Sequence, residues 1–208
     1  AGIDLHESWD GSSWTEIADS NNDRVYLGSD GTQTAAIAFG GRNNTPPTSA
    51  SDYAEIWNGT SWTEVGDLNT ARLQTTGCGT TTAAVCIGGD SPTTVANVET
   101  WNGTSWTETT DLPTANSQAT ASGTSTEALH IGGNSITATI VKAWDGTTWY
   151  TSPALSTTRI QLQTGSNGPV STAMVAGGWS PAGPARTDAT EEYSGVTTAA
   201  EASDISFD

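Results

Sequence analysis

Positively charged side chains are scarce in this sequence. It has one lysine, Lys142, and five arginines against 23 acidic residues, so the formal net charge is −17 at pH 7. Such a surface repels phosphate backbones and anionic lipid headgroups, which excludes nucleic acid and membrane surfaces as expected partners. Acidic, lysine-poor surfaces stay soluble in salty water. This favours a virion or extracellular setting.

Long apolar runs are also lacking. No run approaches the roughly 18 residues that a membrane-spanning helix needs, so no membrane insertion is expected. Residues 1–5 have neither the basic nor the apolar region of a signal peptide, and the sequence does not begin with Met. We therefore expect a processed product or a piece of a longer chain. A chain of 208 residues is long enough for one all-β domain with a sizeable core.

The sequence contains only two cysteines and two histidines. A predicted turn near residues 80–81 places Cys78 opposite residue 83 or 84, which favours two half-buried free thiols over a disulfide with Cys86. His6 falls on a predicted strand before the first tryptophan pair. His130 occupies a position that holds small residues elsewhere in the chain, so we expect a hydrogen-bonded or partly exposed side chain rather than a catalyst.

Tryptophan, in contrast, is abundant and regularly placed. Eight of the nine tryptophans form four pairs, each with an Asn-Gly or Asp-Gly dipeptide between its members. Such a dipeptide between β-prone residues predicts a hairpin with a type I′ turn. Buried indoles at regular positions are typical of a core. The pairs are Trp9 and Trp14, Trp57 and Trp62, Trp101 and Trp106, and Trp144 and Trp149.

The tryptophan pairs belong to a longer internal repeat. Ten residues after each second tryptophan comes Arg24, Arg72, Asn116 or Arg159, and a glycine pair follows at 40–41, 88–89, 132–133 and 177–178. A degenerate copy of the first hairpin strand begins at Glu191. We therefore predict a single domain, residues 1–208, with repeats at about 1–50, 51–94, 95–138 and 139–187 and a partial repeat at 188–208.

The strand before each glycine pair predicts how the repeats pack. Side chains alternate between the two faces of a strand, and here one face is mostly bulky and the other mostly small. The bulky face of one sheet can pack on the small face of the next. Repetition around an axis then gives a β-propeller. The bulky set is Ile37, Val85, Leu129 and Met174 with Phe39, Ile87, Ile131 and Ala176; the small set is Ala36, Ala84, Ala128 and Ala173 with Ala38, Cys86, His130 and Val175.

A basic residue that opens a strand, a glycine pair, an aromatic residue and a second tryptophan together resemble the kelch repeat of β-propellers. Runs such as residues 57–72 are also similar to repeat arrays in tail or fibre proteins of marine bacteriophages. The resemblance implies a kelch-like propeller of four, alternatively five, four-stranded blades. In the simplest closure, the N-terminal hairpin (residues 4–18) completes the blade begun by residues 159–178. Residues 188–208 are then surplus strands.

Catalytic and metal-binding patterns are incomplete. Glu7, Glu55, Glu99 and Glu191 recur at one strand position, with Lys142 in the remaining copy. Paired carboxylates can act as acid and base, but this repetition predicts a solvated stripe. Residues 8–14 resemble the turn of sialidase-like propellers but lack one residue of it. Residues 19–23 begin like a calcium loop but have Arg24 where the loop needs glycine. The histidines and tyrosines do not group as the copper site of kelch-type oxidases requires. We predict no metal, no cofactor and no enzymatic activity.

The loops after the glycine pairs vary in length and content, and they should gather on one face of the disc. Function on a repeat scaffold usually lies in such loops. An exposed aromatic residue beside planar donors suits a sugar or a protein. We therefore predict a non-enzymatic recognition or display module, on a phage tail fibre, another virion protein or an extracellular surface, that binds a glycan or a host-surface protein. The alternatives are a structural fibre or capsid subunit that assembles with neighbouring copies, and a glycan-cleaving propeller. The candidate binding residues are Trp179, Arg42, Asn43, Asn44, Asp90, Asn134 and Arg186.

Overall fold

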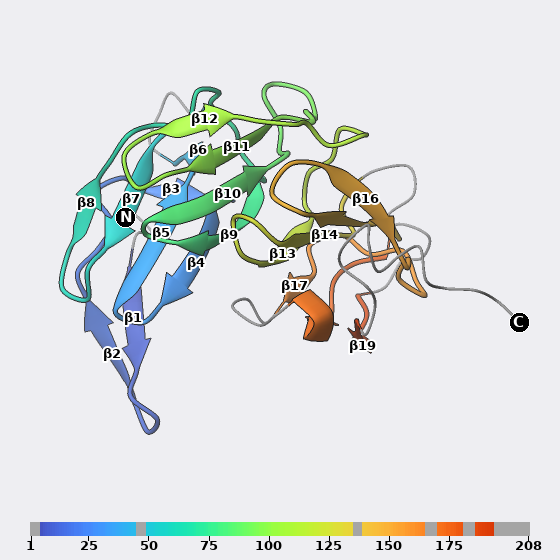
Figure 1. Cartoon of the computed structure of the whole chain (residues 1–208). Helices are drawn as coiled ribbons and strands as arrows, with labels where there is room; N and C mark the ends of the chain where they lie inside the picture. The colour runs from blue at the N-terminus through green and yellow to red at the C-terminus, as the bar shows by residue number, and fades with distance from the viewer. Residues whose placement is uncertain (1–4, 45–48, 135–138, 165–169, 181–185, 194–208) are drawn as a thin grey trace, which may run out of the picture.

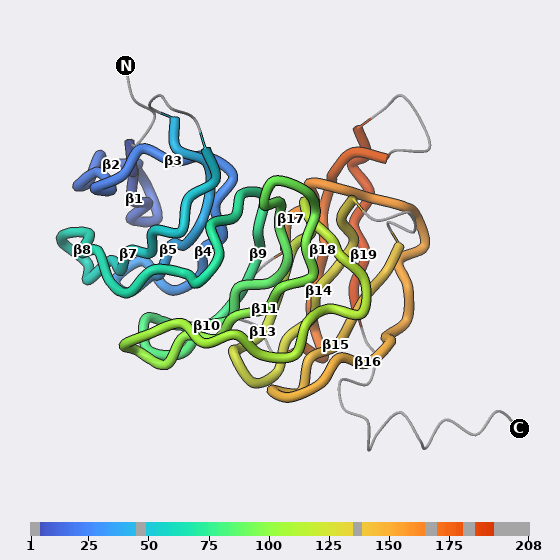
Figure 2. Tube along the Cα trace, turned by 90° about the horizontal axis from the view of Figure 1, so that it is seen from above, coloured from blue at the N-terminus to red at the C-terminus, as the bar shows by residue number. Residues whose placement is uncertain are grey.

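The computed structural model of the chain describes residues 5–44, 49–134, 139–164, 170–180 and 186–193. These residues form an all-β, four-bladed β-propeller arrangement, as the sequence predicts. Figures 1 and 2 show the blades following one another in chain order. Blade 1 contains β4 (Gly28–Thr32), β5 (Ala35–Phe39), β7 (Ala54–Trp57) and β8 (Trp62–Glu64). Blade 2 contains β9 (Thr76–Thr80), β10 (Ala83–Ile87), β11 (Val98–Trp101) and β12 (Trp106–Glu108).

Blade 3 contains β13 (Thr120–Gly123), β14 (Ala128–Ile131), β15 (Val141–Trp144) and β16 (Trp149–Ser152). Blade 4 contains three described strands, β17 (Gln163–Thr164), β18 (Met174–Ala176) and β19 (Thr190–Glu192), with the 3-10 turn η1 (Val170–Thr172) before β18. Two small sheets stand apart from the blades. They are the hairpin β1 (His6–Trp9) with β2 (Trp14–Ile17), and the pair β3 (Arg24–Val25) with β6 (Arg42–Asn43).

The predicted packing of bulky on small faces is confirmed. One cluster joins Ile37 and Phe39 of blade 1 to Ala84 and Cys86 of blade 2, and the Phe39 ring lies 5.1 Å from that of Trp106. Equivalent clusters join blade 2 to blade 3 and blade 3 to blade 4. The core is therefore a series of layers between blades.

The tryptophan hairpins form as predicted, but their turn is different. In the second hairpin Trp57 lies opposite Trp62, so four residues lie in the loop. Only Gly59 has positive φ, whereas a type I′ turn requires it at two successive positions. The Asn58 side chain instead accepts hydrogen bonds of 2.9 Å from the N–H groups of Thr60 and Ser61. The prediction of a type I′ turn was wrong because the side-chain acceptor supplies the turn.

The glycine pairs serve tight packing between blades. Gly88 and Gly89 have φ of +58° and +111°, and the Gly89 N–H donates to the Asn116 carbonyl of the next blade at 2.9 Å. A methyl group at Gly88 would lie 2.3 Å from that carbonyl oxygen. A side chain therefore does not fit there unless the backbone of the next blade shifts, and only glycine adopts this φ without strain.

The predicted closure by the N-terminal hairpin is wrong. Strand β18 pairs with β19, so residues 190–192, expected to be surplus, are the outer strand of blade 4. The hairpin β1–β2 forms its own sheet beside blade 1, far from blade 4 in both views (Figures 1 and 2). The reason is the pattern that begins at Glu191, which supplies blade 4 with its own equivalent of β7. Residues 194–208 lie outside the described part.

Cys78 and Cys86 are free thiols, as predicted, but the prediction that they are half-buried was wrong, because both are fully buried. The hairpin register places Cys78 opposite Val85, not opposite residue 83 or 84 as predicted. Burial raises the pKa of both thiols above the ordinary value. None of the described helical segments is long and apolar enough to cross a membrane.

Candidate functional site

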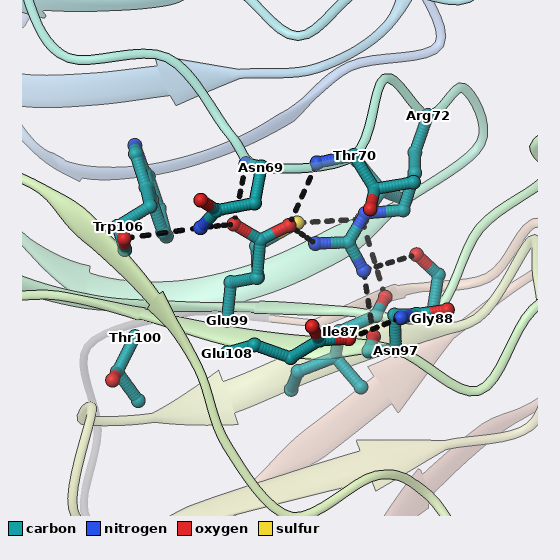
Figure 3. A network of polar contacts seen from close by, with 12 residues as sticks. Asn69, Thr70, Arg72, Ile87, Gly88, Asn97, Glu99, Thr100, Trp106 and Glu108 are labelled. Carbon is teal, nitrogen blue, oxygen red and sulfur yellow. Dashed lines mark hydrogen bonds and ion pairs between the residues drawn. The ribbon is translucent and has the colours of Figure 1, made fainter.

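In three of the four blades, a buried arginine holds the variable loop in place. In blade 2, Arg72 donates through Nη1 to the carbonyls of Gly88 (3.2 Å) and Asn97 (2.6 Å), at the two ends of the loop that follows the glycine pair. Its Nη2 donates to Glu99 at 2.7 Å (Figure 3). The backbone N–H of Asn69 donates to the same carboxylate at 2.7 Å. The loop is therefore fixed to the sheet at both ends.

We call each such arginine, with the groups to which it donates, a clamp. The recurring glutamates are parts of these clamps, so the prediction of a solvated stripe was wrong. Arg24 pairs with Glu55 as Arg72 pairs with Glu99, and these glutamate side chains are 0% and 1% exposed. Arg159 pairs with Glu191, whose side chain is 23% exposed. A buried carboxylate is tolerated because the guanidinium and backbone N–H groups compensate its lost hydration. Glu7 alone is exposed, as predicted.

Blade 3 lacks the ion pair. The side-chain amide of Asn116 donates to the Gly132 carbonyl at 2.8 Å, and Lys142 replaces the glutamate and donates to Thr151. His130 lies opposite Lys142 in this blade, is 1% exposed and has no hydrogen-bond partner among the described residues at either ring nitrogen. The expectation of a hydrogen-bonded or partly exposed His130 was therefore wrong. Burial lowers the pKa of His130 to about 4.

Four residues next to the clamps have an unusual backbone conformation. Tyr26, Gln74, Gln118 and Gln161 each lie two residues after the clamp position, with φ between +54° and +58°. The N–H of Gln74 donates to Tyr26, that of Gln118 to Gln74 and that of Gln161 to Gln118, at 2.8–3.1 Å. Positive φ is uncommon for residues other than glycine and costs roughly 1–3 kcal/mol each, so this ladder fixes a strained geometry.

The same four side chains line one cavity of about 420 Å³ where the four blades converge. The Nε2 of Gln118 donates to Oε1 of Gln74 at 3.0 Å. Tyr26 is 52% exposed, so the cavity is open at that side. Among the described residues, the lining contains no carboxylate or histidine and otherwise comprises Leu27, Thr75, Ala119, Leu162 and Gln163.

The structure places four of the predicted binding residues at one repeat position beside this cavity. Arg42 pairs with Val25, Asp90 with Leu73 and Trp179 with Ile160, and the N–H of Asn134 donates to the Ser117 carbonyl. Each of these partners directly precedes a cavity residue in sequence. The Arg42 guanidinium lies 5.3 Å from the centre of the Tyr26 ring, and its buried Nε has no hydrogen-bond partner in the described part of the chain. Trp179 is 41% exposed.

The three other predicted residues lie farther along the same loops. Asn43 pairs with Arg24, and the Asn44 side chain donates to Asp23 at 3.2 Å. Arg186 is exposed and pairs with Trp179. Asp23, part of the calcium-like sequence, is thus engaged by Asn44. The described residues contain no cluster of three or more metal-ligating side chains. Residues 45–48, 135–138 and 181–185 of these loops lie outside the described part.

Sequence reasoning missed Tyr26 and the three glutamines. A signal was present, since glutamine recurs two residues after the clamp position in three of four repeats. The positive φ that turns these side chains toward a common axis has no signature in the residue types. No known protein family matches the chain, and no curated protein is detectably similar to it in sequence.

Proposed function

We propose that the protein is a non-enzymatic recognition module that binds a glycan in the cavity where the four blades converge (the axial cavity) and at its rim. The rim consists of the predicted residues beside the cavity, which are Arg42, Asp90, Asn134 and Trp179, together with Arg186. The observation that supports this most directly is the convergence of Tyr26, Gln74, Gln118 and Gln161, all at positive φ, on one open cavity. Backbone strain at several equivalent positions is typical of sites where side-chain direction serves binding.

The chemistry of the lining favours a neutral, polyhydroxylated ligand. A primary amide donates and accepts hydrogen bonds at once, as a pair of sugar hydroxyls requires. The rings of Tyr26 and Trp179 offer apolar faces on which a sugar can stack. A cavity of about 420 Å³ lies within the roughly 300–1,000 Å³ typical of small-ligand sites.

The rim adds charge to this neutral cavity. Arg42 and Arg186 form no ion pair within the described ranges, whereas Arg24, Arg72 and Arg159 all do. An arginine without an ion-pair partner can bind a carboxylate or a hydroxyl pair in a fixed orientation. The rim would therefore favour glycans with an acidic group near the bound sugar.

The repeat pattern and the net charge of −17 support the proposed setting. A glycine pair and paired aromatics in each repeat, with an arginine in three of the four, resemble kelch propellers, and the array is similar to those of phage tail or fibre proteins. We place the module on a virion or an extracellular surface, where an acidic, lysine-poor exterior limits non-specific adhesion.

A glycan array with purified protein tests the proposal. We expect binding to a restricted set of glycans, with at least tenfold weaker binding by Trp179→Ala and by the double variant Gln74→Ala/Gln118→Ala. Thr104→Ala is the matched control, because Thr104 lies in the turn between β11 and β12, at the end of the blade opposite to the cavity. Unchanged binding by both cavity and rim variants would remove the proposed site. Equal loss with Thr104→Ala would show a general folding defect.

Two other functions have different expectations. A structural fibre or capsid subunit is favoured by the N-terminal hairpin, whose Trp9 and Trp14 are 44% and 64% exposed. Light scattering at micromolar concentration distinguishes that case by the mass of the particle. A glycan-cleaving enzyme needs a pair of carboxyl groups at the bound sugar, and none of the described residues that line the cavity has one. Release of product from a bound glycan would contradict our proposal.

A further inference from the structure

The N-terminal hairpin has the structure of half a blade. Strand β1 pairs only with β2, with Glu7 opposite Glu16 and Trp9 opposite Trp14. This register repeats that of β7–β8, where Glu55 lies opposite Glu64 and Trp57 opposite Trp62. The inner edge of β7 is hydrogen-bonded to β5, as β11 is to β10 and β15 to β14. The corresponding edge of β1 pairs with no described strand.

The half-blade lies where a blade before blade 1 would lie. Nε2 of Gln33 donates to the Trp9 carbonyl at 2.7 Å, and the His6 ring lies 5.1 Å from that of Trp62. Between the hairpin and the small face of blade 1 is a cavity of about 400 Å³ lined by Leu5, His6, Ala36 and Ala38 among others. In blades 2 to 4 the equivalent small face is covered by the bulky inner strands of the preceding blade.

Two side chains of the half-blade lack partners that inner strands supply elsewhere. Glu7 is exposed, whereas the equivalent Glu55 and Glu99 bind the arginine before the first inner strand of their own blade. Trp9 is 44% exposed, whereas Trp57 is 5% exposed and donates through Nε1 to the Gln33 carbonyl in the inner turn. Trp101 and Trp144 make the same bond to Thr81 and Ser125.

The described residues contain no unpaired inner hairpin that could bind to β1. Each of the four inner pairs is already bound by its own outer strand, at β5–β7, β10–β11, β14–β15 and β18–β19. A second copy could supply one only by releasing its own outer strand. Three features, the free edge of β1, the unpaired Glu7 and the exposed Trp9, would all be satisfied by one partner. That partner is a two-stranded hairpin with an arginine before its first strand and a glycine pair after its second.

We propose that β1–β2 is a docking site for such a hairpin, carried by a polypeptide segment outside these 208 residues, and that its binding completes a fifth blade. The hairpin adds its second strand antiparallel to β1, its arginine pairs with Glu7, and its bulky face fills the cavity on blade 1. Addition of a strand to an open edge is an established mode of peptide recognition. The positive charge of the arginine on the incoming hairpin complements the acidic surface of this protein.

The test uses residues 22–41 of the chain as the incoming hairpin, because they contain Arg24, both inner strands of blade 1 and the glycine pair but no cysteine. We would fuse this segment to the N-terminus of the 208-residue protein through a flexible linker, which gives a millimolar effective concentration. Hydrogen exchange of the β1 amides and tryptophan emission are the measurements. We expect at least tenfold slower exchange in β1 and a blue shift of the emission.

Matched variants test the specific contacts. Glu7→Gln in the fusion, or Arg24→Gln in the added segment alone, should each return β1 exchange to at least half the rate of the unfused protein. Glu16→Gln should not, because its equivalent Glu64 forms no ion pair with any described residue. Unchanged β1 exchange in the fusion would overturn the proposal. So would a stable dimer of the unfused chain that Glu7→Gln dissociates, because the occupant would then be a second copy.

Discussion

The guanidinium of Arg72 and the carboxylate of Glu99 form an ion pair of 2.7 Å with side chains only 0% and 1% exposed. Removal of one member leaves the other charge buried without its partner, which typically costs about 3–5 kcal/mol. We expect Arg72→Asn to lower the free energy of unfolding by that amount in urea titrations. Arg186→Ala, at an exposed position, should change it by less than about 0.5 kcal/mol.

Blade 3 provides a compensating pair for the same experiment. Asn116 and Lys142 occupy the positions of Arg72 and Glu99 there, so no buried carboxylate remains. We expect the double variant Arg72→Asn/Glu99→Lys to be more stable than Arg72→Asn alone by at least about 1 kcal/mol. A double variant that is less stable than the single one would contradict a charge-based account of the clamp.

His130 makes stability depend on pH. Burial lowers its pKa from 6.5 to about 4 in the folded protein, so between these values the unfolded chain binds the proton more readily. Stability is therefore complete above pH 6.5 and falls as the pH decreases toward 4. At about 1.4 kcal/mol per pKa unit, the loss by pH 4.5 is roughly 2–3 kcal/mol.

Urea unfolding of wild type and His130→Val at pH 7.5 and 4.5 checks this value. Valine is the residue at the equivalent position of blade 4, Val175, so it suits the packing. Protonation of carboxylates affects both proteins alike, and the difference between the two pH profiles isolates His130. Parallel profiles would show that His130 does not carry the acid sensitivity.

Gly88 should be the more sensitive of two glycines with positive φ. At Gly88 an added methyl group lies 2.3 Å from the Asn116 carbonyl oxygen, whereas at Gly103 the nearest atom is 3.3 Å away. Gly103→Ala should cost only the backbone strain, about 1–2 kcal/mol. Gly88→Ala should cost at least about 3 kcal/mol, because the next blade must also shift. Thermal unfolding of both variants gives the comparison, and equal costs would argue against tight packing between blades.

Gln118 separates binding from stability. Its φ of +57° is strained for glutamine but not for glycine, so Gln118→Gly relieves strain while it increases the entropy of the unfolded chain. We expect these effects to leave the free energy of unfolding within about 1 kcal/mol of wild type. Affinity for an array-selected glycan should fall at least tenfold. Retained affinity would show that the amide does not contact the ligand.

The layered core could be predicted because it depends on periodicity. Alternation of Ile37 and Phe39 with Ala36 and Ala38, repeated in each unit, is a local pattern that fixes which faces must meet. The spacing of Trp57 and Trp62 likewise fixed a hairpin. Its turn type was missed because Asn58 can supply either positive φ or a side-chain acceptor, and the residue type is the same for both.

The charged positions were interpreted wrongly for a different reason. Glu55 and Glu99 recur on a strand, which is also what a solvated stripe looks like. Their burial depends on Arg24 and Arg72, which lie about 30 residues away in sequence but form ion pairs of 2.7 Å with them in the folded chain. His130 was also interpreted wrongly. Its position holds small residues in the other repeats, and this gave no indication that a histidine there would be buried without a hydrogen-bond partner in the part of the chain that the structure describes.

By itself, the sequence determined the repeat, the hairpins and the nesting of successive sheets, because these follow from side-chain alternation and local turn chemistry. Only the tertiary structure decided which outer strand completes each blade and where the four positive-φ side chains converge. Both outcomes depend on strand pairing between distant segments, and the free energies of the competing pairings differ through contacts that no single repeat contains.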